Sequence, residues 1–159
     1  MSQSKGEIFE RIRSERGGLA SIHLAFGDFA QGVAAHYDFY KSIMLAEDLP
    51  LDRSDREYLA TETSRLNRCP YCIAHHSEAL KIAGSEPKGE RLTILKTLAQ
   101  SMTLEPWKSS SLFDQFITQG FSHAQWQHAV MVVSYFNFVN RCAHAMSLEV
   151  EPDFKETCR

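Results

Sequence analysis

Two cysteines, a histidine and a glutamate stand at a spacing that suits thiol redox chemistry: Glu57, Cys69, Cys72 and His76. If a helix begins near Cys69, then Cys72 lies three residues on and His76 four residues beyond it, so that all three side chains project from one side. A helix N-terminus and a neighbouring imidazole both favour the thiolate, which is the reactive form of cysteine. An enzyme is therefore the leading hypothesis.

These residues predict a reaction cycle. The Cys72 thiolate would attack the distal oxygen of a hydroperoxide and become a sulfenic acid, which Cys69 would convert into a disulfide. His76 would act as the general base and acid. Glu57 must come from the preceding helix folded back antiparallel, because along one straight helix it would lie about 18 Å from Cys69. Its expected role is to orient the imidazole and relay protons.

The elements that position these residues are all predicted to be helices. Apolar side chains recur at three- and four-residue steps, and no segment shows the alternation of a strand or a hairpin turn. Caps and breaks indicate helices over residues 5–16, 19–45 with a break near 27–28, 52–66, 70–83, 90–101, 106–120 and 122–147. We expect an all-α fold, a single-domain helical bundle of six or seven helices over residues 6–159, after a disordered N-terminus at residues 1–5.

Composition excludes several classes of partner. The formal net charge is −3 with no basic patch or stripe, so we expect no nucleic-acid partner. The N-terminus has no apolar run typical of a signal peptide, and the longest apolar segment, residues 129–139, has about half of the roughly 20 residues that a membrane-spanning helix needs. We therefore expect a cytoplasmic protein with no membrane span. In that compartment, four cysteines do not indicate a structural disulfide framework.

The remaining polar positions carry weaker signals. Cys142 lies in an apolar helical pattern and is expected to pack as a small hydrophobe, whereas Cys158 falls in a predicted tail. Asn137, Asn140 and Arg141 interrupt an apolar helix, which indicates either a buried network near the active site or an interface. The other histidines share no metal-ligand spacing and are expected to be structural: His23, His36, His123, His128 and His144.

The segment EYLATETSRLNRCPYCIAHHSEAL, residues 57–80, matches a Glu-x11-Cys-x2-Cys-x3-His signature. It resembles the peroxidase-related branch of the alkylhydroperoxidase D-like, carboxymuconolactone decarboxylase superfamily, and residues 135–154 resemble it less closely. This resemblance implies an AhpD-like fold, a trimer or hexamer, and hydroperoxide reduction. It assigns Cys72 as peroxidatic, Cys69 as resolving, His76 as general base and Glu57 as proton relay. It also implies a lipoyl- or thioredoxin-type thiol reductant as partner.

One position departs from the pattern of that superfamily. Its characterised type has a histidine just before the second cysteine, where this chain has Tyr71. A phenol cannot act as a base near neutral pH. His75 is an available auxiliary residue, but adjacent residues on a helix point about 100° apart, so it should not share the direction of His76.

Other interpretations of the cysteine pair remain open. A structural zinc site could use Cys69, Cys72, one histidine and Glu57, but such sites favour more cysteine and histidine ligands. The sequence Cys-Pro-Tyr-Cys also occurs in glutaredoxins, which need a strand before the motif. A general protein disulfide oxidoreductase and a non-catalytic redox-sensing helical protein use the same thiols. For the leading hypothesis we expect no metal and no cofactor.

Overall fold

The computed structural model describes residues 4–158, and over these residues the chain is helical with no strand. The α-helices are α1 Lys5–Arg16, α2 Ser21–Ala25, α3 Ala30–Tyr40, α4 Arg53–Leu66, α5 Pro70–Ala83, α6 Gly89–Leu104, α7 Phe113–Thr118 and α8 His123–Ala145. A π-helical turn, η1 Lys41–Leu45, extends α3, and two 3-10 helices are η2 Pro106–Leu112 and η3 Phe154–Cys158. The all-α prediction is confirmed, and the eight α-helices of residues 4–158 slightly exceed the expected six or seven.

Local sequence signals explain most helix ends. Ser4 and Glu7 form a capping box at the start of α1, and Ser122 and Gln125 form another at the start of α8. Gly17 ends α1 in the left-handed conformation, with φ of 75°. Pro70 occupies the first turn of α5, where its missing N–H has no helical partner to lose. These ends agree with the sequence-based boundaries.

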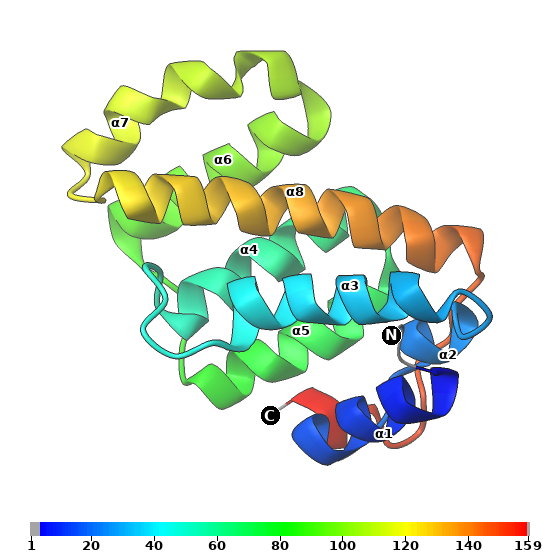
Figure 1. Ribbon diagram of the computed structural model, residues 1–159. Coiled ribbons are helices and arrows are strands. Elements are labelled where there is room, and N and C mark those ends of the chain that lie inside the picture. Colours follow the sequence, from blue (N-terminus) through cyan, green and yellow to red (C-terminus); the bar gives the residue numbers. More distant parts are fainter. Residues whose placement is uncertain (1–3, 159) are drawn as a thin grey trace.

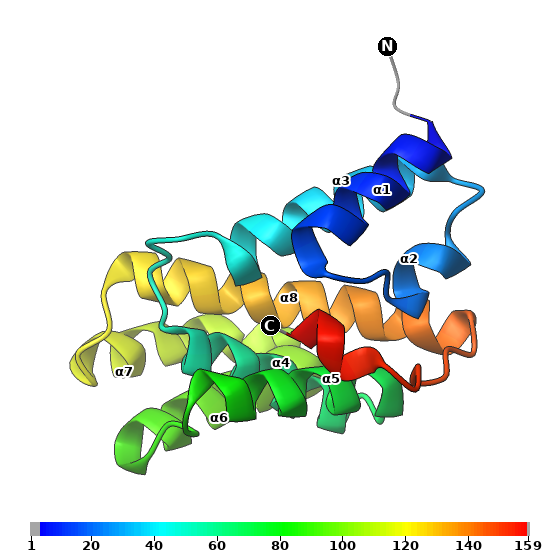
Figure 2. The same ribbon diagram turned by 90° about the horizontal axis from the view of Figure 1, so that it is seen from below.

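Helices α4 and α5 form the antiparallel pair at the centre of the molecule (Figure 1). A short turn joins them, and Arg68 takes a left-handed conformation there, with φ of 54°. Helices α6 and α8 also pack on α4, while α1 packs on α3. Seen from below, α1, α2 and η3 gather on the same side of the molecule as the start of α5 (Figure 2).

The central helix α4 is unusual because its charged residues are buried together with its apolar ones. Asp55, Arg56, Glu57 and Glu62 all lie in the interior. Asp55 accepts hydrogen bonds from Arg91 on α6, and Arg56 donates to the carbonyl oxygen of Leu51. Buried charges of this kind persist only when they are paired. The polar sequence of α4 therefore reflects specific partners on its neighbours.

The segment after α8 does not form the tail expected for Cys158. It returns across α5 and ends in η3, whose Cys158 side chain is buried. The Cys158 sulfur lies 3.4 Å from the carbonyl oxygen of His75 and 3.3 Å from that of Phe154, so its single proton can be donated to either one, and the Phe154 ring packs edge-on against His75. The expectation was wrong because these contacts join residues far apart in the sequence and leave no periodic pattern. None of the described helices is both long and apolar enough to cross a membrane.

Candidate functional site

Glu57 and His76 meet across the α4–α5 pair. The Oε2 atom of Glu57 lies 2.7 Å from Nδ1 of His76, and Glu57 is 1% exposed. A second contact, 3.7 Å long, joins Oε1 of Glu57 to Nε of Arg53. Because a carboxylate only accepts hydrogen bonds, Nδ1 of His76 carries the proton and Nε2 is left with a free lone pair. The predicted antiparallel return of Glu57 is thus present in the structure.

Cys69 and Cys72 lie side by side at the start of α5 as free, buried thiols. The Cys72 thiol lowers the pKa of Cys69 to about 6, against the opposing effect of burial, and the Cys72 backbone N–H adds to the lowering. The pKa of Cys72 is raised, first by Cys69 and then by burial. The sequence predicted Cys72 as the attacking thiolate, whereas in the singly ionised pair the structure favours the thiolate on Cys69 and the proton on Cys72. The two thiols titrate as one unit, so the opposite pKa shifts of Cys69 and Cys72 describe how they share one proton.

A cavity of about 70 Å³ opens onto this centre. Cys72 and His76 line it, whereas Cys69 does not. Its walls include aromatic and imidazole side chains from α2, α3, α5 and α8, together with residues of α1 and η3; the aromatic and imidazole residues are His23, His36, Tyr40, Tyr71, His75, Tyr135 and Phe136. A reactant in this cavity therefore meets Cys72 first and Cys69 only behind it.

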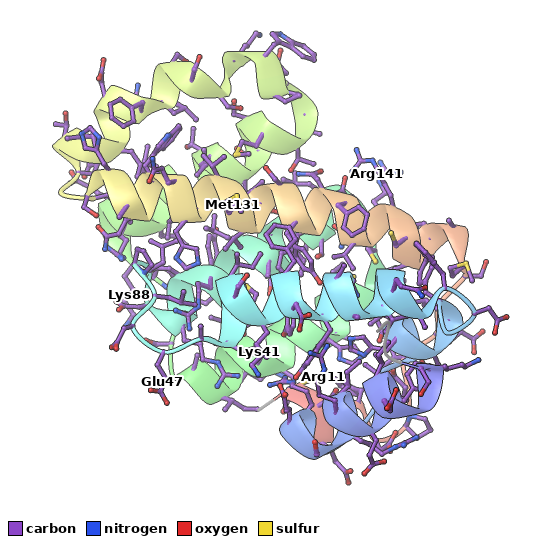
Figure 3. All side chains as sticks on the ribbon, in the orientation of Figure 1. Arg11, Lys41, Glu47, Lys88, Met131 and Arg141 are labelled. Atoms are coloured by element: carbon purple, nitrogen blue, oxygen red, sulfur yellow. The ribbon has the colours of Figure 1, made fainter. Side chains whose placement is uncertain are left out.

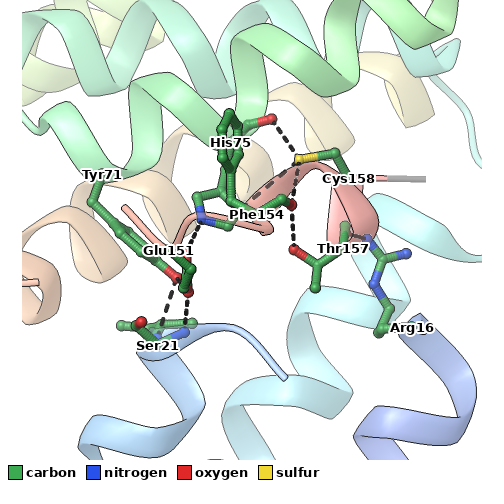
Figure 4. A network of polar contacts seen from close by, with 9 residues as sticks. Arg16, Ser21, Tyr71, His75, Glu151, Phe154, Thr157 and Cys158 are labelled. Atoms are coloured by element: carbon green, nitrogen blue, oxygen red, sulfur yellow. Dashed lines mark hydrogen bonds and ion pairs between the residues drawn. The ribbon is translucent and has the colours of Figure 1, made fainter. Parts of the chain in front are cut away.

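His75 and Tyr71 both contact a second carboxylate, Glu151 (Figure 4). The Tyr71 hydroxyl donates to Oε1 of Glu151 at 3.0 Å and accepts from the backbone N–H of Ile22 at 3.3 Å. Nε2 of His75 lies 2.8 Å from Oε2 of Glu151. The two adjacent histidines thus have separate carboxylate partners, as their helical angle predicted, and His75 does not take the place of the missing histidine beside Cys72.

Sequence reasoning gave Glu151 no role. It lies on the irregular segment after α8, where no period relates it to α5, and 76 residues separate it from His75. Burial alone would raise the pKa of Glu151, but hydrogen bonds from His75 and from the Ser21 backbone N–H outweigh it and lower this pKa to about 2. Glu151 is therefore ionised at neutral pH and accepts from each of its partners.

The asparagines of α8 form a buried network beside the cysteines. Asn140 donates to the Ser64 hydroxyl at 3.0 Å and accepts from the Asn67 side chain at 3.0 Å. A hydrogen bond from its side chain also opposes the raised pKa of Cys72. Asn137 accepts from the same Asn67 amide. Arg141 instead projects outward from α8 (Figure 3). Of the two alternatives for these polar residues, the structure favours a network near the site for both asparagines.

The remaining histidines divide into two groups. His128 bridges the Leu51 N–H and the Ile43 carbonyl oxygen, which is the structural role expected for it. His23 and His36 unexpectedly line the cavity, and Nε2 of His36 lies 2.6 Å from the Tyr135 hydroxyl. Within residues 4–158, no group of three or more histidine, cysteine or acidic side chains is arranged to hold a metal ion. The zinc alternative therefore has no ligand set in this part of the chain.

Comparison with known proteins places this arrangement among all-helical proteins of AhpD-like fold. Residues 31–90 match the model of the carboxymuconolactone decarboxylase family. This match covers the Glu57–His76 signature on which the predicted resemblance rests. No functionally curated protein matches the chain.

Three solved structures show how widely the fold is shared. A peroxidase-related protein from Ralstonia eutropha JMP134, described as an alkylhydroperoxidase AhpD core, superposes with a TM-score of 0.84 at 18% identity, over 97% of this chain and 90% of its own. A peroxidase-related protein from Silicibacter sp. TM1040 gives 0.79 at 20% identity, over 95% and 86%. The debrominase Bmp8 gives 0.63 at 16% identity, over 95% and 88%. At these identities the likeness establishes the fold, and the reaction must be argued from the site.

Proposed function

We propose that the protein reduces hydroperoxides through a dithiol–disulfide cycle of Cys69 and Cys72, assisted by His76 and Glu57. The observation that carries this proposal is the Glu57–His76 contact of 2.7 Å beside a cavity that Cys72 lines. The site thus supplies a nucleophile in Cys72, a base in His76 and a residue that orients this base in Glu57, which is the pattern of an activated thiol. The peroxidase-related neighbours share the fold, and this supports the same reaction class.

The first half of the cycle makes the sulfenic acid. One thiol proton of the pair passes to Nε2 of His76, and Glu57 stabilises the imidazolium. Transfer of the remaining proton from Cys72 to Cys69 places the thiolate on the sulfur that faces the cavity. Cys72 then attacks the terminal peroxide oxygen, the O–O bond breaks, and the departing alkoxide takes the proton from His76.

The second half closes the disulfide. Cys69 gives its proton to His76, and its thiolate attacks the sulfur of the Cys72 sulfenic acid. The departing hydroxide takes that proton and leaves as water. The sum is two thiols and one hydroperoxide converted into one disulfide, one alcohol and one water. An external dithiol must then reduce the disulfide, and we propose a lipoyl- or thioredoxin-type protein for this step.

Peroxide-dependent oxidation of purified variants tests the proposal. The wild-type protein should lose about two daltons as the disulfide forms, whereas Cys69→Ser should stop at a sulfenic acid that dimedone traps. Cys72→Ser should show neither product, and Cys142→Ser should behave like the wild type because Cys142 lies outside the cavity lining. Full peroxide consumption by Cys72→Ser would refute the proposal.

Burial of the thiols separates this proposal from the two alternatives kept from the sequence. Cys69 is 1% exposed and Cys72 is 3% exposed, so a small hydroperoxide reaches them more readily than a folded protein substrate does. This favours a small substrate over a general protein disulfide oxidoreductase. A redox sensor would form the same disulfide but would not turn over when a dithiol reductant is supplied. Steady-state turnover that exceeds the rate of free cysteine would exclude the sensor.

We also propose an oligomeric state and a cellular location for the protein. We propose a trimer or hexamer, as the superfamily resemblance implies, and a location in the cytoplasm, as the sequence predicts. Large exposed apolar side chains such as Met131 and Phe138, seven residues apart on α8, offer surface for a subunit interface. Light scattering of the purified protein measures the mass directly, and a monomer at micromolar concentration would contradict the assembly.

A further inference from the structure

A second set of thiol, imidazole and carboxylate lies at the cavity, whose lining includes its thiol, Cys158, and its imidazole, His75. The Cys158 sulfur lies 4.0 Å from Nδ1 of His75, whose Nε2 contacts Glu151 at 2.8 Å (Figure 4). Because the ionised Glu151 only accepts, Nε2 of His75 carries the proton and Nδ1 presents its lone pair to the Cys158 thiol. This is the same chemical order as in Glu57, His76 and the cysteine pair, and Cys158 and Cys72 line one cavity.

The Cys69–Cys72 disulfide of the first set needs a route by which it is reduced, and the Cys158 thiol of the second set can supply one. A disulfide between Cys69 and Cys72 would be buried, with no surface on which a protein reductant could reach either sulfur. The cavity borders Cys72. Cys158 borders that cavity from η3, a short helix on the outside of α5 whose Lys155 and Glu156 side chains are exposed. Cys158 is itself only 4% exposed, so it becomes accessible only if η3 moves. This five-residue helix packs mainly on the outside of α5, whereas Cys72 is fixed within the α4–α5 pair. Movement of η3 would let Cys158 face the cavity in one position and an external reductant in another.

We propose that Cys158 is a shuttle thiol, which reduces the Cys69–Cys72 disulfide from within the cavity and passes the oxidation to an external dithiol. The proposal rests on the disulfide cycle proposed above and adds the route by which that disulfide is reduced. It assigns His75 as the base for Cys158 and Glu151 as the residue that positions His75. It also explains why His75 and Tyr71 contact Glu151 and not the cysteine pair.

The exchange balances without any further reactant. The Cys158 thiol gives its proton to Nδ1 of His75, and its thiolate attacks the Cys72 sulfur. The Cys69–Cys72 bond breaks, and Cys69 leaves as a thiolate that takes the proton from His75. An external dithiol then attacks Cys158 and releases Cys72 as a thiol, and its second sulfur closes its own disulfide as Cys158 departs. The protein is reduced and the external dithiol is oxidised.

Two electrostatic properties suit these roles. The hydrogen bond from the Cys72 backbone N–H persists when the Cys72 sulfur is in a disulfide, and it lowers the pKa of Cys69, which makes Cys69 a better leaving group in exchange. Burial raises the pKa of Cys158 to about 11, so it rests as a thiol and needs the His75 base before it can attack. A disulfide requires its sulfurs to be about 2.05 Å apart. During the step η3 must therefore shift toward the start of α5.

The first test asks whether the two sulfurs can meet, and it uses diamide in place of peroxide. In Cys69→Ser the tryptic peptide of residues 69–81 retains only Cys72, while Cys158 lies in the peptide of residues 156–159. We expect diamide to link these two peptides by a disulfide within one chain. Absence of the link, or a link only to the peptide of residues 142–155 that contains Cys142, would overturn the proposal.

The second test measures the reduction step itself. Wild type, Cys158→Ser and Cys142→Ser are oxidised with diamide, checked for the Cys69–Cys72 disulfide by mass, and reduced with dithiothreitol. We expect reduction of Cys158→Ser to be at least about tenfold slower than that of the other two, because the buried disulfide has lost its internal attacking thiol. Equal rates in all three would overturn the shuttle. Since neither test uses a hydroperoxide, failure of the peroxidase proposal gives a different pattern, in which disulfides form and exchange but peroxide is not consumed.

Discussion

At the scale of single residues, the contact between Glu57 and His76 decides what the imidazole can do. A carboxylate at Nδ1 holds the ring in one tautomer and stabilises the imidazolium that forms when Nε2 takes a proton. Packing by Tyr40 and Phe136 holds the ring from either side, with centroids 6.2 and 4.5 Å from that of His76. A base fixed in this way needs no further reorganisation when a hydroperoxide enters.

Replacement of Glu57 by glutamine tests this role. Glu57→Gln keeps the size of the side chain but removes the charge that stabilises the imidazolium, so we expect kcat/KM for hydroperoxide to fall about 100-fold. Steady-state peroxide consumption measures the effect. The matched control is Glu62→Gln, because Glu62 is also buried on α4 but pairs with Arg65. If both variants lose activity equally, the effect comes from the stability of α4 and not from catalysis.

The shared proton of the cysteine pair gives a pH prediction. With the pKa of Cys69 lowered to about 6, the pair loses its first proton near that pH, and the rate of oxidation by peroxide should rise through pH 6 and level off above it. In Cys69→Ser the remaining thiol keeps the effect of burial, so its pKa should lie at or above the ordinary 9.0. Ultraviolet absorbance of the thiolate follows both titrations. An unshifted midpoint in Cys69→Ser would contradict the coupling.

The sequence predicted the first carboxylate–histidine contact but not the second, for a physical reason. Glu57 and His76 lie on regular helices joined by a short turn, so the helical period and the antiparallel return together bring them close. Glu151 lies on an irregular segment, and its contact with His75 depends on how that segment folds over α5. Tertiary packing alone sets such a contact, and no local pattern records it.

At the scale of elements, the asparagine network joins α8 to the turn that positions the cysteines. Asn140 is fully buried and links Ser64 on α4 to Asn67 in the α4–α5 turn. One hydrogen bond holds the last turn of α4 at Ser64, and the other holds Asn67 in the turn that leads into Cys69. Networks of this kind stabilise one arrangement strongly, because a single lost member leaves buried partners unpaired.

Asn140→Ala should therefore destabilise the protein more than its size suggests. Loss of the amide leaves the Asn67 amide and the Ser64 hydroxyl each without one partner, and we expect the free energy of unfolding to fall by about 1–3 kcal/mol. Urea denaturation measures it. Gln127→Ala, an exposed position on the same helix, should change it by less than about 0.5 kcal/mol. A change for Asn140→Ala as small as that of the control would show that the network does not stabilise the fold.

Element boundaries were largely predictable, whereas the burial of α4 was not. Capping residues, Pro70 and the glycines mark helix ends through local backbone chemistry, which the sequence displays directly. The polar composition of α4 suggests an exposed helix, yet Asp55 and Arg56 are buried because partners on other segments satisfy them. Sequence periodicity indicates which face of a helix is apolar, but it does not indicate which charges will find partners.

At the scale of the whole molecule, Glu151 holds the segment after α8 against two other parts of the chain. Its carboxylate accepts from Tyr71 and His75 on α5 and from the Ser21 backbone N–H at the start of α2. Thr157 and Cys158 of the same segment line the cavity, so the position of this segment determines how closed the cavity is. The ionised Glu151 carboxylate thus holds in place the segment that closes one side of the cavity.

These contacts predict that the Glu151 carboxylate contributes to the free energy of unfolding at neutral pH and that acid removes this contribution. Its pKa in the folded protein is about 2, below the ordinary 4.5, because hydrogen bonds from His75 and Ser21 outweigh burial. A carboxylate with a lowered folded pKa contributes stability that is fully present above the unfolded value and is lost as the pH falls through the folded one. The difference in free energy of unfolding between wild type and Glu151→Gln should therefore be constant near neutral pH and shrink between pH 4.5 and about 2. Urea denaturation of both proteins across this range measures it, with Glu149→Gln, an exposed neighbour, as the variant whose difference from wild type should stay near zero. A difference for Glu151→Gln that does not change with pH would mean that the carboxylate charge does not hold the segment in place.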